Sequence, residues 1–517
     1  MTFPVVLLVT YTTLNLNIFC HSLSIKSYKD IIKLDSSFDS TIKSYWNDHY
    51  NRRRVNLACA LKICYLAYLD GSAVDRIHVL TLEADTFKRT GSPISLDGHE
   101  AGGLVAHEDG FAILTNQKVR GPKYPITFLL RYSKDGRMIW KRALNGPTVR
   151  AYMGQTSTPD INGDLVYSEK AKLYCAYFVA TAYSGEFNGH FGDSIQCVDP
   201  DGKMVDGGTP WICSHNTGIG FEAADETPFA SVCAEDTGSI WLNTNSRRME
   251  GPKISNENTA VGSSGEPMGG MSGSYSVLAR FQKSPMYIFA WASRGSKNLK
   301  KDMEFMRDNP KSMKSEPRWL NRNVAVAILK TKGSLLGKEA SSVPGSLDGD
   351  SQVDFLTRSD TEDHRNVRTA TLTSDLAIVS WDTLKGAKCG PLPLSCTGKY
   401  SGTSYVLVNS QGKKQGKEIV EQIPVSGDMV TMADGRVCWP YSPTTWSFQG
   451  PKGAPTLVNT LSIACAENGK DLSSEKSRAD DLAERSPGTT DDQLQENTTS
   501  IKKNPPPPES CAVGKNR

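Results

Sequence analysis

Short apolar segments separated by tight polar turns run through most of the chain. Val, Ile, Tyr, Phe and Thr are frequent in these segments, as in "ICYLAYLDG" from residue 63 and "YIFAWAS" from residue 287. Such residues favour strands, and the clusters of Gly, Asp, Asn and Pro between them favour turns. The best helical segment, residues 301–313, is interrupted by Pro310. The pattern therefore predicts an all-β chain built from hairpins.

Dipeptides that end in glycine lie between consecutive apolar segments. Glycine adopts the positive φ angle that tight hairpin turns require at no steric cost. We therefore expect a hairpin at each of these dipeptides, which begin at Asp109, Asp135, Asp201, Gln411 and Asp434.

The strand groups recur along the chain with a loose period of roughly 40 to 65 residues, which lies partly within and partly beyond the usual length of four-stranded propeller blades. Seven starts predict seven blades, and six or eight remain alternatives. The innermost strands are expected to begin near Arg54, His99, Ser157, His215, Gly273, His364 and Ser426.

The repeated succession of a strand, an Asp-Gly turn and a strand with tryptophan, as in "SKDGRMIW" at 133–140, resembles β-propeller proteins of the quinoprotein-like and kelch-like sort. No specific family is identified, because a repeated Trp-Asp dipeptide, a kelch double-glycine series and a complete cofactor motif are all missing. The resemblance implies a single β-propeller over residues 23–466. Residues 246–275 and 296–317 depart from the pattern and are expected to be surface insertions between strands.

The two ends of the chain have a different composition from the body. Residues 1–22 hold an apolar run followed by small residues, which is typical of a signal peptide; a buried N-terminal strand is the alternative. Residues 467–517 are polar and proline-rich and are expected to be disordered. Asn497 begins an Asn-Thr-Thr sequence, a glycosylation acceptor in an exported chain.

Cysteine usage agrees with an exported protein. The chain has 12 cysteines, and no CxxC or HxxxH spacing indicates zinc, so disulfides are the better interpretation. Cys389 and Cys396 enclose a short proline-containing loop, and Cys213 and Cys233 flank an expected hairpin. The disulfide candidates are Cys213, Cys233, Cys389, Cys396, Cys438 and Cys465.

Charge and hydropathy exclude two classes of partner. Lys and Arg total 59 against 56 acidic residues, so the net charge of +3 gives no field that favours nucleic acid. No later segment reaches the ~20 continuous apolar residues of a membrane span. We expect a secreted monomer.

Histidines precede several of the expected innermost strands. His99 and His364 each stand 12 residues before an apolar strand, and His215 stands 14 residues before one. Blades around one axis would bring these three side chains to one mouth of the channel, where they could bind a divalent metal or act in acid-base chemistry. Structural hydrogen bonding is the alternative. Further ligand-binding candidates nearby are Glu100, Asp363 and His190.

Other polar stretches are weaker candidates. His107, Glu108 and Asp109 lie at an expected hairpin tip, where solvated side chains are common. "DINGDLVYSEK" at 160–170 resembles a calcium loop, but Ala171 occupies the position of the bidentate glutamate, so a structural calcium remains only an option. Trp446, in the loop after Tyr441, could stack on a sugar or anchor a peptide.

Complete catalytic motifs are missing from the sequence: there is no G-x-S-x-G elbow, phosphate loop or HExxH. The leading hypothesis is therefore a secreted, non-catalytic propeller that binds an extracellular glycan or protein partner. The alternative is a polysaccharide lyase or glycoside hydrolase with a histidine-lined site at the channel mouth.

Overall fold

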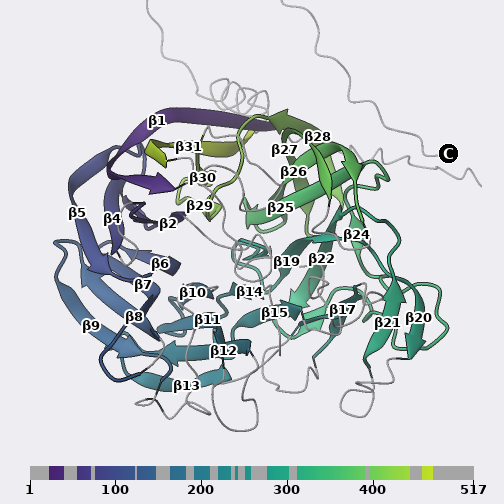
Figure 1. Ribbon diagram of the computed structural model, residues 1–517, viewed down its shortest axis with the longest axis horizontal. Helices are drawn as coiled ribbons and strands as arrows, with labels where there is room; N and C mark the ends of the chain where they lie inside the picture. The colour runs from purple at the N-terminus through teal and green to yellow at the C-terminus, as the bar shows by residue number, and fades with distance from the viewer. Residues whose placement is uncertain are drawn as a thin grey trace, which may run out of the picture. The chain divides into compact units, whose positions relative to one another are not determined.

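The chain is a seven-bladed β-propeller whose blades are four-stranded antiparallel sheets (Figure 1). The computed structural model describes residues 22–39, 55–71, 76–99, 101–122, 125–146, 149, 163–181, 191–209, 219–234, 239–242, 251–257, 276–301, 311–390, 396–442 and 457–469. Leu23–Glu467 form one compact unit, and all seven blades belong to it. No helix occurs among the described residues, and so none that is long and apolar enough to cross a membrane.

Each blade contributes one innermost strand to the ring, and these strands begin within a few residues of the seven predicted starts. The innermost strands are β2 (Val55–Cys59), β6 (Ala101–His107), β10 (Gly163–Ser168), β14 (Ile219–Glu222), β18 (Leu278–Arg280), β25 (Glu362–Thr371) and β29 (Val430–Thr431). The second strands are β3 (Ile63–Leu69), β7 (Gly110–Gln117), β11 (Leu173–Thr181), β15 (Ala230–Ala234), β19 (Tyr287–Ser293), β26 (Leu376–Lys388) and β30 (Val437–Tyr441).

The outer half of each blade completes the sheet. The third strands are β4 (Arg76–Glu83), β8 (Ile126–Ser133), β12 (Phe191–Val198), β16 (Ser239–Leu242), β22 (Asn323–Thr331), β27 (Thr397–Asn409) and β31 (Leu457–Gly469). The outermost strands are β5 (Arg89–Asp97), β9 (Met138–Ala143), β13 (Met204–Thr209), β17 (Lys253–Asn256), β23 (Ser334–Leu335), β28 (Lys414–Glu421) and β1 (Ser22–Asp39).

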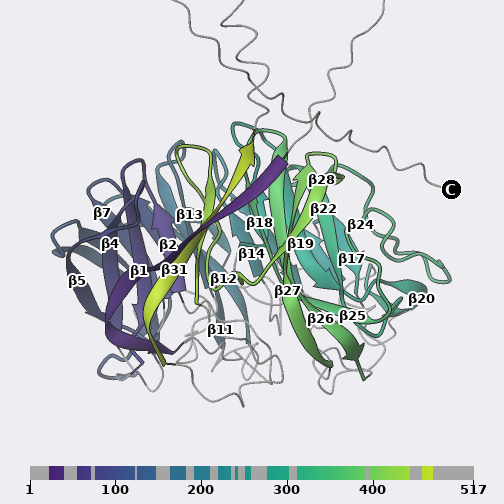
Figure 2. The ribbon, with the colours of Figure 1, turned by 90° about the horizontal axis from the view of Figure 1, so that it is seen from above.

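The seventh blade closes the ring with strands from both ends of the chain. Its sheet has the order β1-β31-β30-β29, so the strand nearest the N-terminus is its outermost strand. Figure 2 shows β1 crossing in front of β31, its neighbour in the sheet. Closing a ring in this way leaves only short, protected strand edges.

The glycines of the predicted turns adopt the required conformation. Gly136, Gly202, Gly412 and Gly435 have φ angles of 84°, 77°, 77° and 87°, and Gly110 has 151°. Each follows the Asp or Gln of its dipeptide, which confirms the predicted turns at these positions.

Seven hydrophobic clusters of described residues fill the seven interfaces between neighbouring blades. Because each blade packs on both faces, its inner strands are apolar almost throughout; all seven residues of β19 are buried, for example. Tryptophan occupies four successive interfaces, and the side chains concerned are Trp241, Trp291, Trp381 and Trp439. These tryptophans therefore have a packing role.

The predicted insertions are partly wrong in their boundaries. Within 246–275, residues 253–256 form β17, the outermost strand of the fourth blade, and they are fully buried. The segment 296–317 does lie between β19 and β22, as predicted, but it contributes a pair of strands, β20 (Lys297–Lys301) and β21 (Met313–Glu316). This pair packs on β17, since Ser315 Oγ donates to the backbone oxygen of Asn256 at 3.2 Å. A further short strand, β24 (Asp354–Phe355), pairs with β22.

Four disulfides join described cysteines, and three of them join register partners on adjacent strands. Cys389–Cys396 closes the predicted short loop, and Cys438–Cys465 joins two further candidates. The other two bridges, Cys59–Cys64 and Cys175–Cys197, were not singled out from the sequence. Cys233 is disulfide-bonded, whereas Cys213 lies outside the described residues, as do residues 1–21 and Asn497.

Candidate functional site

A cavity of about 740 Å³ lies on the axis of the ring. All seven blades line it with their innermost strands or with residues next to those strands. Its lining includes turn residues that follow four of these strands: Leu61 after β2, Glu108 after β6, Glu169 after β10 and Gln282 after β18. The cavity therefore reaches the end of the channel at which the innermost strands terminate.

Carboxylates dominate the charged groups of this lining. The described lining residues include one arginine, Arg280, and five acids, which are Glu108, Asp164, Glu169, Glu222 and Asp428. Four of the acids accept hydrogen bonds from nearby backbone N–H groups. Glu108 accepts from Lys62 at 2.8 Å, and Asp428 accepts from Leu57 at 3.2 Å. Backbone N–H groups thus hold these carboxylates in place along the lining.

Glu222 is the acid of this lining whose pKa is shifted by its surroundings in a way that bears on chemistry. It ends β14, the innermost strand of the fourth blade, and one of its oxygens accepts the N–H of Ala223 at 2.7 Å. Burial raises the pKa of the Glu222 carboxyl to about 7, which outweighs the lowering effect of the backbone N–H groups of Ala223 and Arg280 and of the Arg280 charge. The side chain is nevertheless reachable from the cavity. Glu222 can therefore exchange a proton with a ligand near neutral pH.

Arg280 is held by an acid just outside the cavity lining. Its guanidinium forms an ion pair with Asp225 at 2.8 Å and donates through Nε to the backbone oxygen of Ser284 at 2.8 Å. Lys170 also reaches Asp225, at 3.1 Å. The hydrogen bonds from Arg280 and Lys170 lower the pKa of Asp225 to about 2. The only arginine of the described lining thus already has a charged partner.

An aromatic wall lies between the second and third blades. The His107 ring meets the Tyr167 ring edge-on at 4.9 Å between centroids, and His107 Nε2 is hydrogen-bonded to the Tyr174 hydroxyl at 2.6 Å. Burial, assisted by the nearby Arg131 charge, lowers the pKa of His107. His107 is therefore neutral at physiological pH. Both His107 and Tyr167 line the cavity.

The expectation that residues 107–109 form only a solvated hairpin tip is partly wrong. The three residues do form the predicted hairpin tip between β6 and β7, but His107 and Glu108 face the channel instead of only bulk water. The reason is that the hairpin turn follows an innermost strand, so its first residues lie next to the axis.

The described histidines of the predicted cluster lie at the opposite ends of their strands. His99 and His364 each stand five residues before the first lining residue of the same blade, Leu104 and Thr369 respectively. Five residues of strand span about 16 Å. The two positions are thus equivalent in the repeat, as predicted, but neither side chain lines the cavity of 740 Å³.

The surroundings of the two histidines differ. His364 is 3 % exposed, and its Nδ1 lies 3.2 Å from the Thr383 hydroxyl, while burial lowers the pKa of the imidazole to about 4. His99 is half-buried and lines a separate pocket of about 290 Å³ with Lys118 and Lys141. Glu100, His190, His215 and Trp446 lie outside the described residues. The predicted three-histidine metal site therefore stays a prediction.

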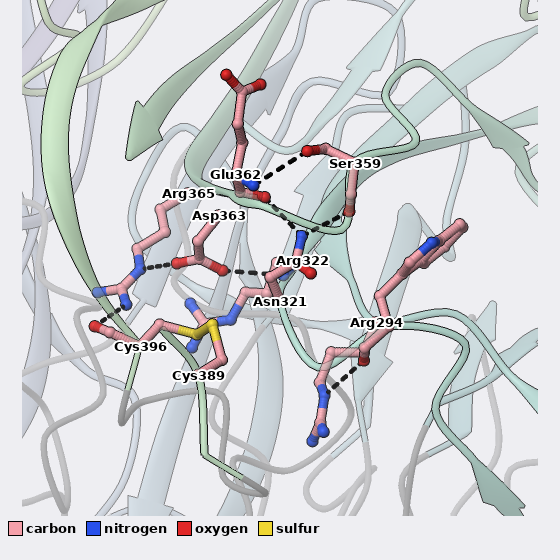
Figure 3. The surroundings of a disulfide bond; sticks show 10 residues. Arg294, Asn321, Arg322, Ser359, Glu362, Asp363, Arg365, Cys389 and Cys396 are labelled. Carbon is pink, nitrogen blue, oxygen red and sulfur yellow. Dashed lines mark hydrogen bonds and ion pairs between the residues drawn. A yellow bond between two sulfur atoms is a disulfide. The ribbon is translucent and has the colours of Figure 1, made fainter. Parts of the chain in front are cut away.

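Another group of side chains meets the distance requirement for a metal among the described residues. It consists of Asp363, Cys389 and Cys396. Figure 3 shows that the two cysteines are joined in a disulfide and that Asp363 turns to the Arg365 guanidinium. Disulfide sulfurs are not thiolate ligands, so these residues do not form a metal centre. Of the calcium-like loop, only Asp164 and the residues after it are described, and an oxygen of Asp164 accepts the N–H of Leu165.

A ring of seven blades around a channel with a charged lining defines a β-propeller with an axial cavity. No protein-family model and no curated protein matches the chain. Among solved structures, the WD40 domain of coronin from Toxoplasma gondii is 8% identical over 88% of this chain and 89% of that chain, with a TM-score of 0.39. A sialidase from Trypanosoma rangeli is 9% identical over 69% and 57%, with a TM-score of 0.34. The fold assignment rests on the strand order of the seven sheets and not on these similarities.

Proposed function

We propose that the chain is an extracellular binding protein whose glycan or protein partner enters the axial cavity. The observation that carries this proposal is the cavity itself, to which all seven blades contribute. Its volume of about 740 Å³ falls in the range of roughly 300–1,000 Å³ that is usual for ligand sites. The four disulfides and the signal-like first 22 residues support the extracellular location.

Filling the cavity should abolish binding. Ala60 lines the cavity at the turn after β2 and is partly exposed. We expect Ala60→Trp to reduce the affinity for a cavity ligand at least tenfold, because the indole occupies space that the ligand needs. The measurement is a titration of the purified full chain against the positives of a glycan array and a panel of secreted proteins.

The matched control is Ala387→Trp, at a partly buried position on β26 that does not line the cavity. It should leave the affinity unchanged. Two results would contradict the proposal: no ligand in either collection, or a ligand whose affinity is equal for the parent and Ala60→Trp.

A second candidate function is cleavage of an extracellular polysaccharide in the same cavity. The observation in its favour is Glu222, since a carboxyl with a pKa of about 7 suits a general acid at neutral pH. Other carboxylates of the lining, such as Asp164, could provide the second acid that glycoside hydrolysis commonly uses. The histidines have no part in this version of the hypothesis.

Glu222→Gln separates the two candidate functions. Because glutamine cannot transfer a proton, we expect this change to lower turnover about 100-fold or more if the cavity is catalytic, and to leave ligand binding nearly unchanged. Release of reducing ends and of unsaturated products from extracellular polysaccharides would be measured. Glu418→Gln, an exposed acid on the outermost strand β28 that does not line the cavity, is the control. A parent protein without turnover on these substrates leaves binding as the function.

A further inference from the structure

The charge of the cavity restricts the chemistry of its ligand. The described lining has five carboxylates against one arginine, and that arginine is paired with Asp225. His107 adds no charge at neutral pH, because burial and Arg131 lower its pKa. One of the five acids, Glu222, has a pKa of about 7 and carries only part of a charge at neutral pH, but the other four leave the lining with more negative than positive charge. An anionic ligand would be repelled there, whereas a cationic ligand would be attracted.

The two exposed acids of the lining are placed to meet a ligand first. Glu108 and Glu169 lie on turns after β6 and β10 and are exposed to solvent. Glu169 is bound to Lys172 at 2.9 Å, but both side chains are largely exposed, so water screens this pair strongly. A ligand cation that desolvates Glu169 can therefore compete with Lys172.

Apolar and aromatic groups next to these acids suit a long basic side chain. Leu61 is 65% exposed at the turn after β2, which leaves an apolar side chain at the mouth without a covering partner. Tyr167, on the third blade, lies next to His107 of the second blade, and both residues line the cavity. Lys and Arg carry an apolar stem and a charged end, and the charged end is attracted to carboxylates and to aromatic faces.

We infer that the cavity accepts a basic segment of a protein partner, with a lysine or arginine side chain inserted along the axis between the carboxylates and the aromatic wall. The inference rests on the proposed binding function and selects, from its two partner classes, a protein with a positively charged loop or terminus. Acidic polysaccharides are excluded as ligands of this mouth by the same charge. Neutral glycans lack the charge that would explain the carboxylates.

Three peptides of equal length test the inference. They are fluorescein-labelled nonamers that alternate serine with lysine, glutamate or glycine, and their binding to the full chain is followed by fluorescence anisotropy. We expect the lysine peptide to bind and the other two to bind at least tenfold more weakly. Because exposed charges are screened by salt, the affinity should fall several-fold between 50 and 300 mM NaCl.

Two variants locate the binding. Glu108→Gln/Glu169→Gln should weaken the lysine peptide by about three- to tenfold, since removing charges at the rim of a site mainly reduces electrostatic attraction. Gln keeps an oxygen that can accept the N–H of Lys62, so the turn is preserved. Glu418→Gln, an exposed acid on the outermost strand β28, is the control and should change nothing.

The outcomes distinguish this inference from the proposed function. Three results would each overturn the cationic ligand. The first is equal binding of the three peptides, and the second is binding of the lysine peptide that neither Ala60→Trp nor the double variant weakens. The third is a neutral glycan that binds the parent but not Ala60→Trp, together with a lysine peptide that does not bind. The last of these results would still support the cavity as a binding site. Absence of any cavity ligand, peptide or glycan, would overturn both.

Discussion

Glu257→Gln should stabilise the protein at pH 8 by about 3 kcal/mol and leave its stability nearly unchanged at pH 4.5. Glu257 is 1% exposed and directly follows β17, the buried outermost strand of the fourth blade. Burial, with a smaller contribution from the nearby Asp350 carboxylate, raises the pKa of its carboxyl to about 7 against the lowering effect of the hydrogen bonds from Trp291 and Ser293. At pH 8 the folded protein must therefore keep an unfavourable charge in its interior.

The direction of the pH effect follows from the two pKa values. The carboxyl has a pKa near 4.5 when unfolded and about 7 when folded, so the folded state binds more protons between these values. Stability therefore falls as pH rises from about 4.5 to 7. A difference of about 2.5 units corresponds to about 3 kcal/mol. The carboxyls of Glu222 and Asp382, whose pKa values burial raises to about 7 and 6, act in the same direction.

The contacts of Glu257 explain why glutamine is tolerated. Oε1 accepts hydrogen bonds from Trp291 Nε1 and Ser293 Oγ, both at 2.8 Å, and a glutamine oxygen can accept both. Oε2 has no hydrogen-bond partner. The substitution thus removes the charge and keeps the bonds that orient the side chain.

Urea unfolding of the oxidised protein at several pH values provides the measurement. Glu226→Gln, with its side chain 81% exposed, is the control and should change the free energy of unfolding by less than about 0.5 kcal/mol at either pH. An equal effect of Glu257→Gln at pH 4.5 and pH 8 would show that the charge of Glu257 is not the cause.

The architecture could be predicted from the sequence because its determinants are local. Alternation of apolar segments with Asp-Gly turns specifies hairpins, and the recurrence of strand groups specifies blades. The start predicted near His215 lies four residues before β14, and the one near Ser426 lies four residues before β29. Each of these signals lies within a short stretch of chain, so no knowledge of distant contacts was needed.

Contacts between distant segments could not be predicted in this way. β1 pairs with β31, more than 400 residues away, and nothing within either segment indicates the other. Likewise, β17 was assigned to an insertion because Lys253, Ser255 and Asn256 are polar. These side chains are buried because the β20–β21 pair and residues 340–349 cover them. The Lys253 ammonium, for example, donates to the backbone oxygen of Lys311 at 2.7 Å.

The candidate site was not predicted from the sequence, because the histidines that recur with the repeat lie at the starts of the innermost strands. The repeat placed His99 and His364 at equivalent positions, but the described cavity lies at the ends of these strands, where Glu108, Glu169 and Glu222 occur. A search for acids directly after each innermost strand could have found them. The shifted pKa of Glu222 could not have been predicted, because its burial depends on neighbouring blades that come from distant parts of the chain.

Asp363→Ala should destabilise the protein by about 3–5 kcal/mol, the largest loss that we expect from a single substitution. Asp363 is fully buried near the start of β25, where one carboxylate oxygen binds the Arg365 guanidinium and the other accepts the N–H of Arg322 at 2.9 Å (Figure 3). Arg365 is itself 3% exposed. Removal of Asp363 leaves this buried guanidinium without its carboxylate, and breaking buried pairs in this way costs about that amount.

The double variant Asp363→Ala/Arg365→Met tests whether the buried charge causes the loss. Methionine has a comparable length and no charge, so we expect the double variant to recover part of the stability that Asp363→Ala loses. Arg365 also donates to the backbone oxygen of Cys396 at 2.9 Å, next to the disulfide, and loss of this bond should prevent full recovery. Glu418→Ala, which breaks the exposed pair with Lys414 at 3.5 Å, should cost less than about 1 kcal/mol. A double variant no more stable than Asp363→Ala would mean that Asp363 stabilises the blade through its bond to Arg322 and not by neutralising Arg365.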